Sequence, residues 1–531
     1  MSADMDQKTK ITKAAGIMSA ATFISRILGY VKDMILAAYF GASGLSDAFF
    51  AAFRIPNLLR ELFAEGSMSS AFIPVLTEYR EKKSEEEAQR LVRITFTFIL
   101  VIVGLICILG IIFSPAVVSV MAPGFLTDHP EQFPLTVLLT RIMFPFLLFI
   151  SLASLVMGSL NTKKVFFVPT LAPAMLNVTI ILIVLAFAPR VSEPIILVAI
   201  AVTVGGFVQF AFQLPSFYRN HYRLGFDPDF RHPGLKKMAI LLLPATMALA
   251  VNQVNILVSS ILASFLPKGS ITMLYYSMRL IQFPVGIFGV AMGMAILPTL
   301  SEHAVRGDMQ RLREDFSFAL RLLFFITVPS MAGLIALREP IVNLLFQRGE
   351  FDYTAMKGTA AALLFYALGI WSMVGVRVVT VTFYSMQDTR TPVKIAAVGM
   401  LSNIFFSIIL MGPMKHSGLA LANALSSIIN FSLLFYFLRK KIQHVEAGRI
   451  MGSFVKTALS SVIMGISGWT LLHGELWQTS GNSAGKITYL TCTIFLCLGI
   501  YIGCSYLLKN EELSYLLNTM KRKFGRKTEG V

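Results

Sequence analysis

Apolar residues fill most of the chain in long blocks, and short polar segments separate the blocks. Each block holds about 20 residues or more, which is the length that an α-helix needs to cross a ~30 Å hydrocarbon core. The blocks and their breaks predict fourteen transmembrane helices, and therefore an all-α polytopic membrane protein. Their expected limits are 13–40, 47–79, 91–121, 136–160, 168–188, 195–218, 237–266, 271–303, 316–337, 354–384, 393–411, 418–438, 454–472 and 487–508.

The composition of the 531-residue chain agrees with this pattern. Hydrophobic residues make up 55% and charged residues only 14%, whereas soluble domains carry about 25% charged residues. The four cysteines lie in apolar blocks without metal-binding spacing, so we expect them to act as small hydrophobic residues. Residues 481–486 lack the spacing of a Walker A motif, and no catalytic constellation stands out. The sequence predicts a protein that is not an enzyme and has no cofactor and no metal.

Basic residues orient the predicted helices. Of the 46 Lys and Arg, thirty-two fall in the termini and one set of loops, eight fall in the opposite loops, and six lie inside spans. Because cytoplasmic loops collect Lys and Arg, this imbalance predicts that both termini are cytoplasmic. The net charge of +17 then follows from membrane topology, and no nucleic-acid partner is expected.

The chain contains an internal repeat with an offset of about 225 residues. Residues 73–78 (IPVLTE) correspond to residues 297–302 (LPTLSE). Each repeat holds six predicted helices, so both enter the membrane in the same sense, as in transporters whose two lobes surround a midplane site. The expected division is an N-terminal lobe at 1–225, a C-terminal lobe at 226–445, two additional helices at 446–510 and a basic cytoplasmic tail at 511–531.

Six cations lie inside apolar spans, where each would cost ~2.5–3.5 kcal/mol if it faced lipid. They are Arg26, Lys32, Arg54, Arg60, Arg279 and Arg377. The acids on the same helices are fewer, so we expect an excess of positive charge within the membrane. The residues beside Arg279 are neutral. A guanidinium without a carboxylate suits a phosphate group, because its planar fork binds two oxygens.

Several short motifs carry a resemblance to a known family. They are residues 25–29 (SRILG), 32–33 (KD), 47–50 (DAFF), 56–60 (PNLLR), 63–66 (FAEG), 71–74 (AFIP), 122–125 (APGF) and 383–385 (FYS). With these motifs the chain resembles the MurJ/MviN lipid II flippases of the multidrug/oligosaccharidyl-lipid/polysaccharide (MOP) exporter superfamily.

The resemblance implies a flippase that carries lipid II, the undecaprenyl-pyrophosphate-linked peptidoglycan precursor, from the inner to the outer leaflet of the bacterial cytoplasmic membrane by alternating access. It implies that cations of a central cavity hold the head group, namely Arg26, Lys32, Arg60 and Arg279. Among the supporting polar residues, Asp33, Asp47, Asn57 and Glu65 correspond to residues of the family, and Ser25 lies in a shared motif. The charge pattern of the spans adds Arg54, Glu61 and Arg377. The implied partners are the lipid-linked precursor, membrane lipids and cell-wall synthesis proteins.

Two features leave alternatives open. Helices 454–472 and 487–508 contain Gly465, Gly468, Gly499 and Gly503, which suit either ordinary close packing or a groove for the lipid tail. Weak candidates for an ion site are Asn252, Asn255, Asn403 and Asn423. No carboxylate accompanies these amides, so interhelical hydrogen bonds are the competing interpretation.

Other functions compete with lipid II transport. One is a flippase for another polyprenyl-linked polysaccharide unit, which uses a similar lipid carrier. Another is a MATE-type exporter, which needs buried acids for cationic substrates, whereas the excess here is positive. A membrane scaffold without transport activity would tolerate the loss of Arg26, Arg60 and Arg279.

Overall fold

The computed structural model describes residues 2–61, 71–443, 445–481 and 483–528, and only the backbone of residues 2–17, 19, 243–252, 290 and 520–528. The chain divides into two compact units, Met1–Gly269 and Ser270–Val531. Throughout these described ranges the secondary structure is helical, without a β-strand. The prediction of an all-α protein is therefore confirmed.

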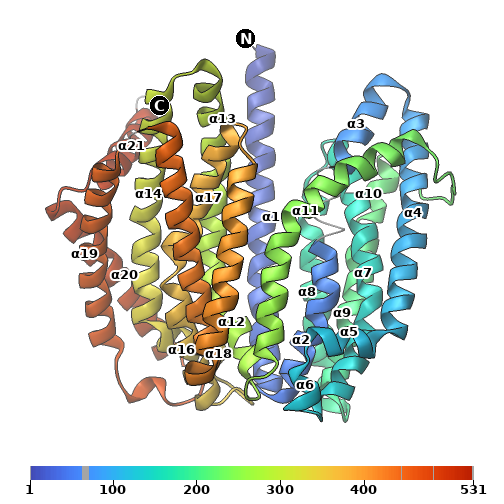
Figure 1. Ribbon diagram of the computed structural model, residues 1–531, viewed down its shortest axis with the longest axis horizontal. Helices are drawn as coiled ribbons and strands as arrows, with labels where there is room; N and C mark the ends of the chain where they lie inside the picture. Colours follow the sequence, from blue (N-terminus) through green and yellow to red (C-terminus); the bar gives the residue numbers. More distant parts are fainter. Residues whose placement is uncertain (1, 62–70, 444, 482, 529–531) are drawn as a thin grey trace. The chain divides into compact units, whose positions relative to one another are not determined.

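The N-terminal unit is built around α7, which packs against α2, α4 and α9, while α1 covers α8 (Figure 1). Side chains of α3, α4 and α7 form its main core. Its helices are α1 (Ser2–Phe40), α2 (Gly44–Arg60), α3 (Ile73–Lys82), α4 (Glu85–Ile112), α5 (Ser114–Met121), α6 (Gly124–Thr127), α7 (Gln132–Thr162), α8 (Phe167–Phe187), a 3-10 turn (Ala188–Arg190), α9 (Pro194–Ala211), α10 (Leu214–Arg219) and α11 (Pro233–Ala263).

The C-terminal unit is organised around α14, which packs against α13, α17 and α19 (Figure 1). Its helices are α12 (Ser270–Pro284), a π-helical segment (Val285–Gly289), α13 (Val290–Arg306), α14 (Met309–Ala336), α15 (Arg338–Phe346), α16 (Tyr353–Ala367), α17 (Ile370–Ser385), α18 (Arg390–Ile442), α19 (Ala447–Leu472), a 3-10 turn (Glu475–Trp477), α20 (Ala484–Leu507) and α21 (Glu511–Thr528).

Polar side chains fix where several helices begin. Ser84, Asp308 and Asp352 each accept a hydrogen bond from the backbone N–H three residues later, at the starts of α4, α14 and α16. Such caps satisfy N–H groups that have no partner inside the first turn of the helix. The same residues lie between apolar blocks in the sequence, so they mark the breaks between blocks.

Within the described residues, nine helices are long and apolar enough to cross a membrane, or ten if the bent pair Tyr353–Ala367 and Ile370–Ser385 is one span. The count treats α18 as one helix, although its backbone leaves the helical conformation at Lys415 (φ 51°, ψ −133°). The predicted helices 393–411 and 418–438 lie on either side of this break. The spans expected in α1, α2–α3 and α11 run through residues or side chains that are not described. The number fourteen therefore stays a prediction.

Several predicted spans are interrupted in the structure. The helix expected at 271–303 is divided by the π-helical segment Val285–Gly289, directly after Pro284. Because π-helical turns are rare and gather at functional sites, this segment singles out the part of the unit that follows Arg279 on α12.

Compactness places the boundary between the units at Gly269, whereas the sequence repeat predicts a boundary at 225/226. The difference is α11, which packs against α4 and α5 of the N-terminal unit. The repeat reflects similarity between two parts of the sequence, whereas the compact units reflect contacts in the structure. The division into lobes at 1–225, 226–445 and 446–510 therefore stays a prediction. The tail expected at 511–531 begins as helix α21.

Candidate functional site

The six cations inside apolar spans lie on four helices of two units. Arg26 and Lys32 are on α1, Arg54 and Arg60 on α2, Arg279 on α12 and Arg377 on α17. The first four therefore belong to the N-terminal unit and the last two to the C-terminal unit. The prediction that Arg26, Lys32, Arg60 and Arg279 form one site spans both units and stays a prediction.

Lys32 and Asp33 form an ion pair on α1. The Nζ atom of Lys32 lies 3.1 Å from Oδ1 of Asp33, and the Asp33 side chain is 0% exposed. A carboxylate that is removed from water is stabilised by an adjacent cation. The structure thus brings together two residues that the sequence predicted as a site cation and its supporting acid.

Arg60 lies in a polar cluster at the end of α2. Its Nε donates to Oδ1 of Asn57 at 3.0 Å, and its Nη2 lies 4.0 Å from Oε1 of Glu61. Asn57 Nδ2 donates to the same oxygen of Glu61 at 3.2 Å. Glu61 has helical dihedral angles (φ −63°, ψ −36°) and its backbone N–H donates to the Asn57 carbonyl oxygen, so the cluster lies on the last turn of α2. Asn57, Arg60 and Glu61 were all predicted as site residues, and the structure brings them together.

The other oxygen of Glu61 is bound by Gln253 of α11. The Nε2 atom of Gln253 donates to Oε2 of Glu61 at 2.5 Å, and Gln253 is buried. This contact joins α2 to α11 inside the N-terminal unit. No signal in the sequence predicts this contact, because the two residues are 192 positions apart and share no motif.

Asp47 has a structural role near the start of α2. It is buried, and its Oδ2 accepts a hydrogen bond from the backbone N–H of Gly269 at 2.6 Å. Gly269 has φ +88°, and an added Cβ there would lie 2.4 Å from the carbonyl oxygen of Ala42. Asp47 therefore stabilises the turn at Gly269, the last residue of the N-terminal unit. In the sequence it precedes the cluster around Arg60.

The remaining predicted residues of α1 and α2 have mixed environments. Ser25, Arg26 and Arg54 are half-buried. The carbonyl oxygen of Ser25 accepts a hydrogen bond from Asn177 Nδ2 of α8 at 3.4 Å, which links α1 to α8 next to Arg26. Glu65 lies outside the described residues.

The two cations of the C-terminal unit flank its π-helical segment. Arg279 is half-buried on α12, six residues before Val285. Arg377 is exposed on α17, and its Cδ lies 3.1 Å from the position that a Cβ on Gly289 would occupy. The aliphatic part of Arg377 therefore covers the end of the π-helical segment, and a side chain at Gly289 would displace it.

The asparagines proposed as weak ion-site candidates are also divided between the units. Asn255 is on α11, whereas Asn403 and Asn423 are on α18. The side chain of Asn252 lies outside the described set. Among described residues, no group of three or more His, Cys, Asp and Glu could hold a metal ion. The amide-only ion site stays a prediction.

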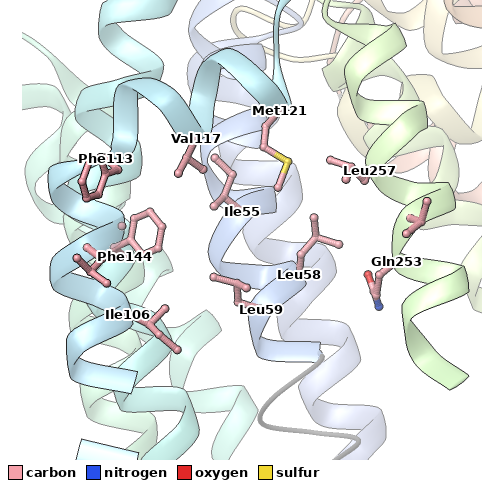
Figure 2. A pocket seen from close by; sticks show the side chains of 13 residues that line it. Ile55, Leu58, Leu59, Ile106, Phe113, Val117, Met121, Phe144, Gln253 and Leu257 are labelled. Atoms are coloured by element: carbon pink, nitrogen blue, oxygen red, sulfur yellow. The ribbon is translucent and has the colours of Figure 1, made fainter. Parts of the chain in front are cut away.

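An apolar cavity of about 510 Å³ adjoins the Glu61–Gln253 contact. Figure 2 shows Leu58 and Met121 on one side of it and Gln253 and Leu257 of α11 on the other. Among the lining residues that the structure describes, Gln253 alone has a polar side chain. These residues are Ile55, Leu58, Leu59, Ile106, Leu109, Gly110, Phe113, Val117, Met121, Phe144, Gln253, Val254 and Leu257.

The predicted tail groove concerns α19 and α20. A Cβ on Gly468 would lie 2.9 Å from Sγ of Cys497, and one on Gly465 would lie 3.6 Å from the Ala332 carbonyl oxygen, so these glycines allow close packing against α20 and α14. Gly499 and Gly503 face open space. The tail-groove assignment stays a prediction.

Comparison with known proteins identifies the family. Residues 36–489 match the family described as "Lipid II flippase MurJ". The "Probable lipid II flippase MurJ" of Vibrio cholerae serotype O1 is 35% identical over 506 residues, which cover 94% of this chain and 96% of that protein.

Solved structures agree with the sequence match. A lipid II flippase MurJ in an inward closed conformation superposes with a TM-score of 0.76 at 29% identity, over 92% of this chain and 98% of the other. An inward-facing MATE transporter of the MOP superfamily superposes with a TM-score of 0.67 at 13% identity, over 82% of this chain and 99% of the other. The second match shows a shared fold alone. The chain therefore belongs to the MurJ family of lipid II flippases and shares the fold of MOP superfamily transporters.

Proposed function

We propose that this chain is a transporter that moves lipid II across the bacterial cytoplasmic membrane, from the inner to the outer leaflet, with both termini in the cytoplasm. Family membership over residues 36–489 is the observation that carries this proposal. The chemistry of the spans supports it. The diphosphate of the substrate cannot cross hydrocarbon unaided, and the chain keeps cations on helices that are otherwise apolar.

We assign the head-group contacts to Arg26, Lys32, Arg60 and Arg279. Arg60 is held in position by Asn57 and Glu61, which leaves it part-exposed and pre-oriented for an anion. Pre-orientation lowers the entropy that binding must remove. Lys32 supplies a compact charge without the two-pronged geometry of arginine, so we assign it attraction of the diphosphate rather than its orientation.

Supporting roles follow from the partners of each residue. Asp33 and Glu61 limit the positive excess beside Lys32 and Arg60, and Asp47 holds the turn at Gly269. Arg377 and Arg54 add positive charge on α17 and α2. The helices at 446–510 would receive the lipid tail, and enzymes that make or consume the precursor are the expected protein partners. Asn255 and Asn403 remain candidates for a coupled ion.

The test is complementation in cells depleted of their own lipid II flippase. Wild type should restore growth, and Arg26→Ala, Arg60→Ala and Arg279→Ala should fail although they insert and accumulate normally. Arg219→Ala, which removes an exposed cation at the end of α10, is the matched control and should restore growth. Growth restored by all three span variants would refute the assigned contacts, and failure of wild type would refute lipid II as the substrate.

The alternative functions predict different outcomes in the same cells. A flippase for another polyprenyl-linked unit would fail to restore growth but would rescue export of that polysaccharide. A MATE-type exporter would confer drug resistance without rescue. The shared MATE fold adds no weight to that alternative, because identity is only 13%.

A further inference from the structure

A second apolar cavity lies along α4, in the N-terminal unit, and has a volume of about 630 Å³. This volume is within the ~300–1,000 Å³ range of ligand pockets. Its walls come from α4, α7, α11 and the residues just before α3 and α11. The lining residues are Ala71, Phe72, Thr95, Phe98, Ile99, Ile102, Val103, Ile106, Ser151, Phe230, Arg231, Leu235, Lys236, Met238, Ala239 and Leu242.

This cavity and the cavity of Figure 2 follow each other along α4, and both reach Ile106. We call the two together the α4 groove. On α4 its lining extends from Thr95 to Phe113, which corresponds to roughly 27 Å at 1.5 Å per residue. A bilayer core is ~30 Å thick. The α4 groove therefore extends over most of the depth of a membrane.

Two exposed cations, Arg231 and Lys236, stand at one end of the α4 groove. The acids closest to Arg231 in sequence, Asp227 and Asp229, both pair with Arg90. In the described part of the chain neither Arg231 nor Lys236 has an ion-pair partner. They therefore offer two uncommitted positive charges at one end of an apolar cavity.

The remaining polar side chains of the cavity around Ile102 are already satisfied. Thr95 Oγ1 donates to the Leu91 carbonyl oxygen at 2.8 Å, and Ser151 Oγ donates to the Leu147 carbonyl oxygen at 2.8 Å. The wall offers a ligand little beyond apolar surface and two cations. Sugars and peptides need many hydrogen-bonding groups, whereas a hydrocarbon chain that ends in a phosphate needs only what this lining provides.

Aromatic side chains mark the same end as a membrane boundary. Phe230 is 46% exposed and Phe226 is 68% exposed, and the ring of Phe230 packs edge-on against Phe98 of α4 at 6.3 Å. Apolar rings beside uncommitted cations are typical of segments that lie at a lipid head-group layer. By the positive-inside rule this end faces the cytoplasmic leaflet, which is rich in anionic lipids.

We propose that the α4 groove binds an anionic glycerophospholipid, with the phosphate on Arg231 and Lys236 and one acyl chain along α4. The proposal does not depend on the transport function, because none of the assigned head-group cations lines the groove. A bound phospholipid would fill the space between α4 and α11 and so stabilise the position of α11.

Native mass spectrometry of the full-length protein in detergent tests the proposal, with titration of palmitoyl-oleoyl phosphatidylglycerol or phosphatidylcholine. Wild type should retain phosphatidylglycerol more strongly than phosphatidylcholine. Arg231→Gln/Lys236→Gln should weaken phosphatidylglycerol binding by roughly 30-fold, since each basic residue near a lipid surface contributes about one kcal/mol. Arg219→Gln/Arg223→Gln, which removes two exposed cations outside the lining, should bind as wild type does.

A steric pair of variants locates the bound chain. Ala239→Trp places a bulky ring in the α4 groove, and Ile240→Trp places the same ring at a neighbouring position that is 63% exposed and does not line it. Only Ala239→Trp should reduce retention of both phospholipids. The proposal is overturned if the two Trp variants bind alike, if both charge variants bind alike, or if undecaprenyl pyrophosphate occupies the groove in preference to phosphatidylglycerol.

Discussion

Substitution of Gly124 by alanine probes the contact between α6 and the end of α11. The backbone N–H of Gly124 donates to Oγ of Ser264 at 3.0 Å. A Cβ on Gly124 would lie 2.3 Å from the carbonyl oxygen of Ser264 and 2.5 Å from the backbone nitrogen of Phe265. These are backbone atoms, so no side-chain rotation can relieve the overlap.

The cost of Gly124→Ala follows from these distances. Carbon–oxygen contact becomes ordinary only near 3.4 Å, so α6 has to retreat by about 1 Å, which also stretches the Gly124–Ser264 hydrogen bond beyond its usual length. Forcing an extra carbon into a packed contact costs typically ~1–3 kcal/mol, and a lost hydrogen bond costs about 0.5–1.5 kcal/mol. We expect the free energy of unfolding to fall by roughly 2–4 kcal/mol.

Thermal unfolding in one detergent, at one heating rate, measures the effect. At ~2–4 °C per kcal/mol, the melting temperature of Gly124→Ala should drop by at least about 4 °C. Gly104→Ala is the matched control, because an added Cβ at Gly104 meets no atom within 4 Å and alanine favours a helix. If Gly124→Ala melts within a degree of Gly104→Ala, the contact between α6 and α11 is not formed as described.

Two further predictions concern ion pairs of the C-terminal unit. Burial alone raises the pKa of Asp388, but hydrogen bonds from Lys441 and from a neighbouring threonine outweigh it and lower the pKa from 3.8 to about 2. The ionised Asp388 carboxylate therefore stabilises the fold fully above about pH 4, and this contribution is lost as the pH falls to about 2. The difference in melting temperature between wild type and Asp388→Asn should close over that interval. Arg321→Met should destabilise the docking of α21 by ~3–5 kcal/mol, because it leaves Glu512, which is 1% exposed and paired with Arg321 at 2.7 Å, without its main cation. The melting temperature and the rate of proteolysis at α21 measure this loss of stability. The double variant Arg321→Met/Glu512→Leu should regain stability, because it leaves no unpaired buried charge. If it does not, the Arg321–Glu512 pair is not what holds α21.

The sequence predicted the helical blocks because hydropathy acts locally. The turn between the predicted helices 393–411 and 418–438 is an example. Gly412 and Pro413 interrupt the apolar pattern there, and the backbone leaves the helical conformation two residues later, at Lys415. Gly418 then packs so closely on Leu410 that a Cβ would lie 2.2 Å from its carbonyl oxygen. Both the break and the small residue that closes it are visible in the sequence.

The π-helical segment could not be predicted in the same way. A helical pattern assumes 100° per residue, and a π-helical turn changes that angle at one point without changing hydropathy. Pro284 directly precedes the segment, but a proline inside a span indicates a bend of any kind. The direction of Arg60 was open for a similar reason, because Pro56 lies before it on α2; the structure places its Nη2 4.0 Å from Oε1 of Glu61.

The side chains around a basic residue decide what it can bind, and its charge and its depth in the membrane do not decide this alone. Arg231 and Lys236 count in the sequence only as loop residues that orient the helices, because a linear reading assigns each basic residue to a span or to a loop. Folding places them, exposed, at one end of the α4 groove beside its apolar walls. Arg60 lies within a span, yet its guanidinium is engaged by Asn57 and lies near Glu61. We therefore expect the substitutions at Arg231 and at Arg60 to affect lipid retention and transport separately.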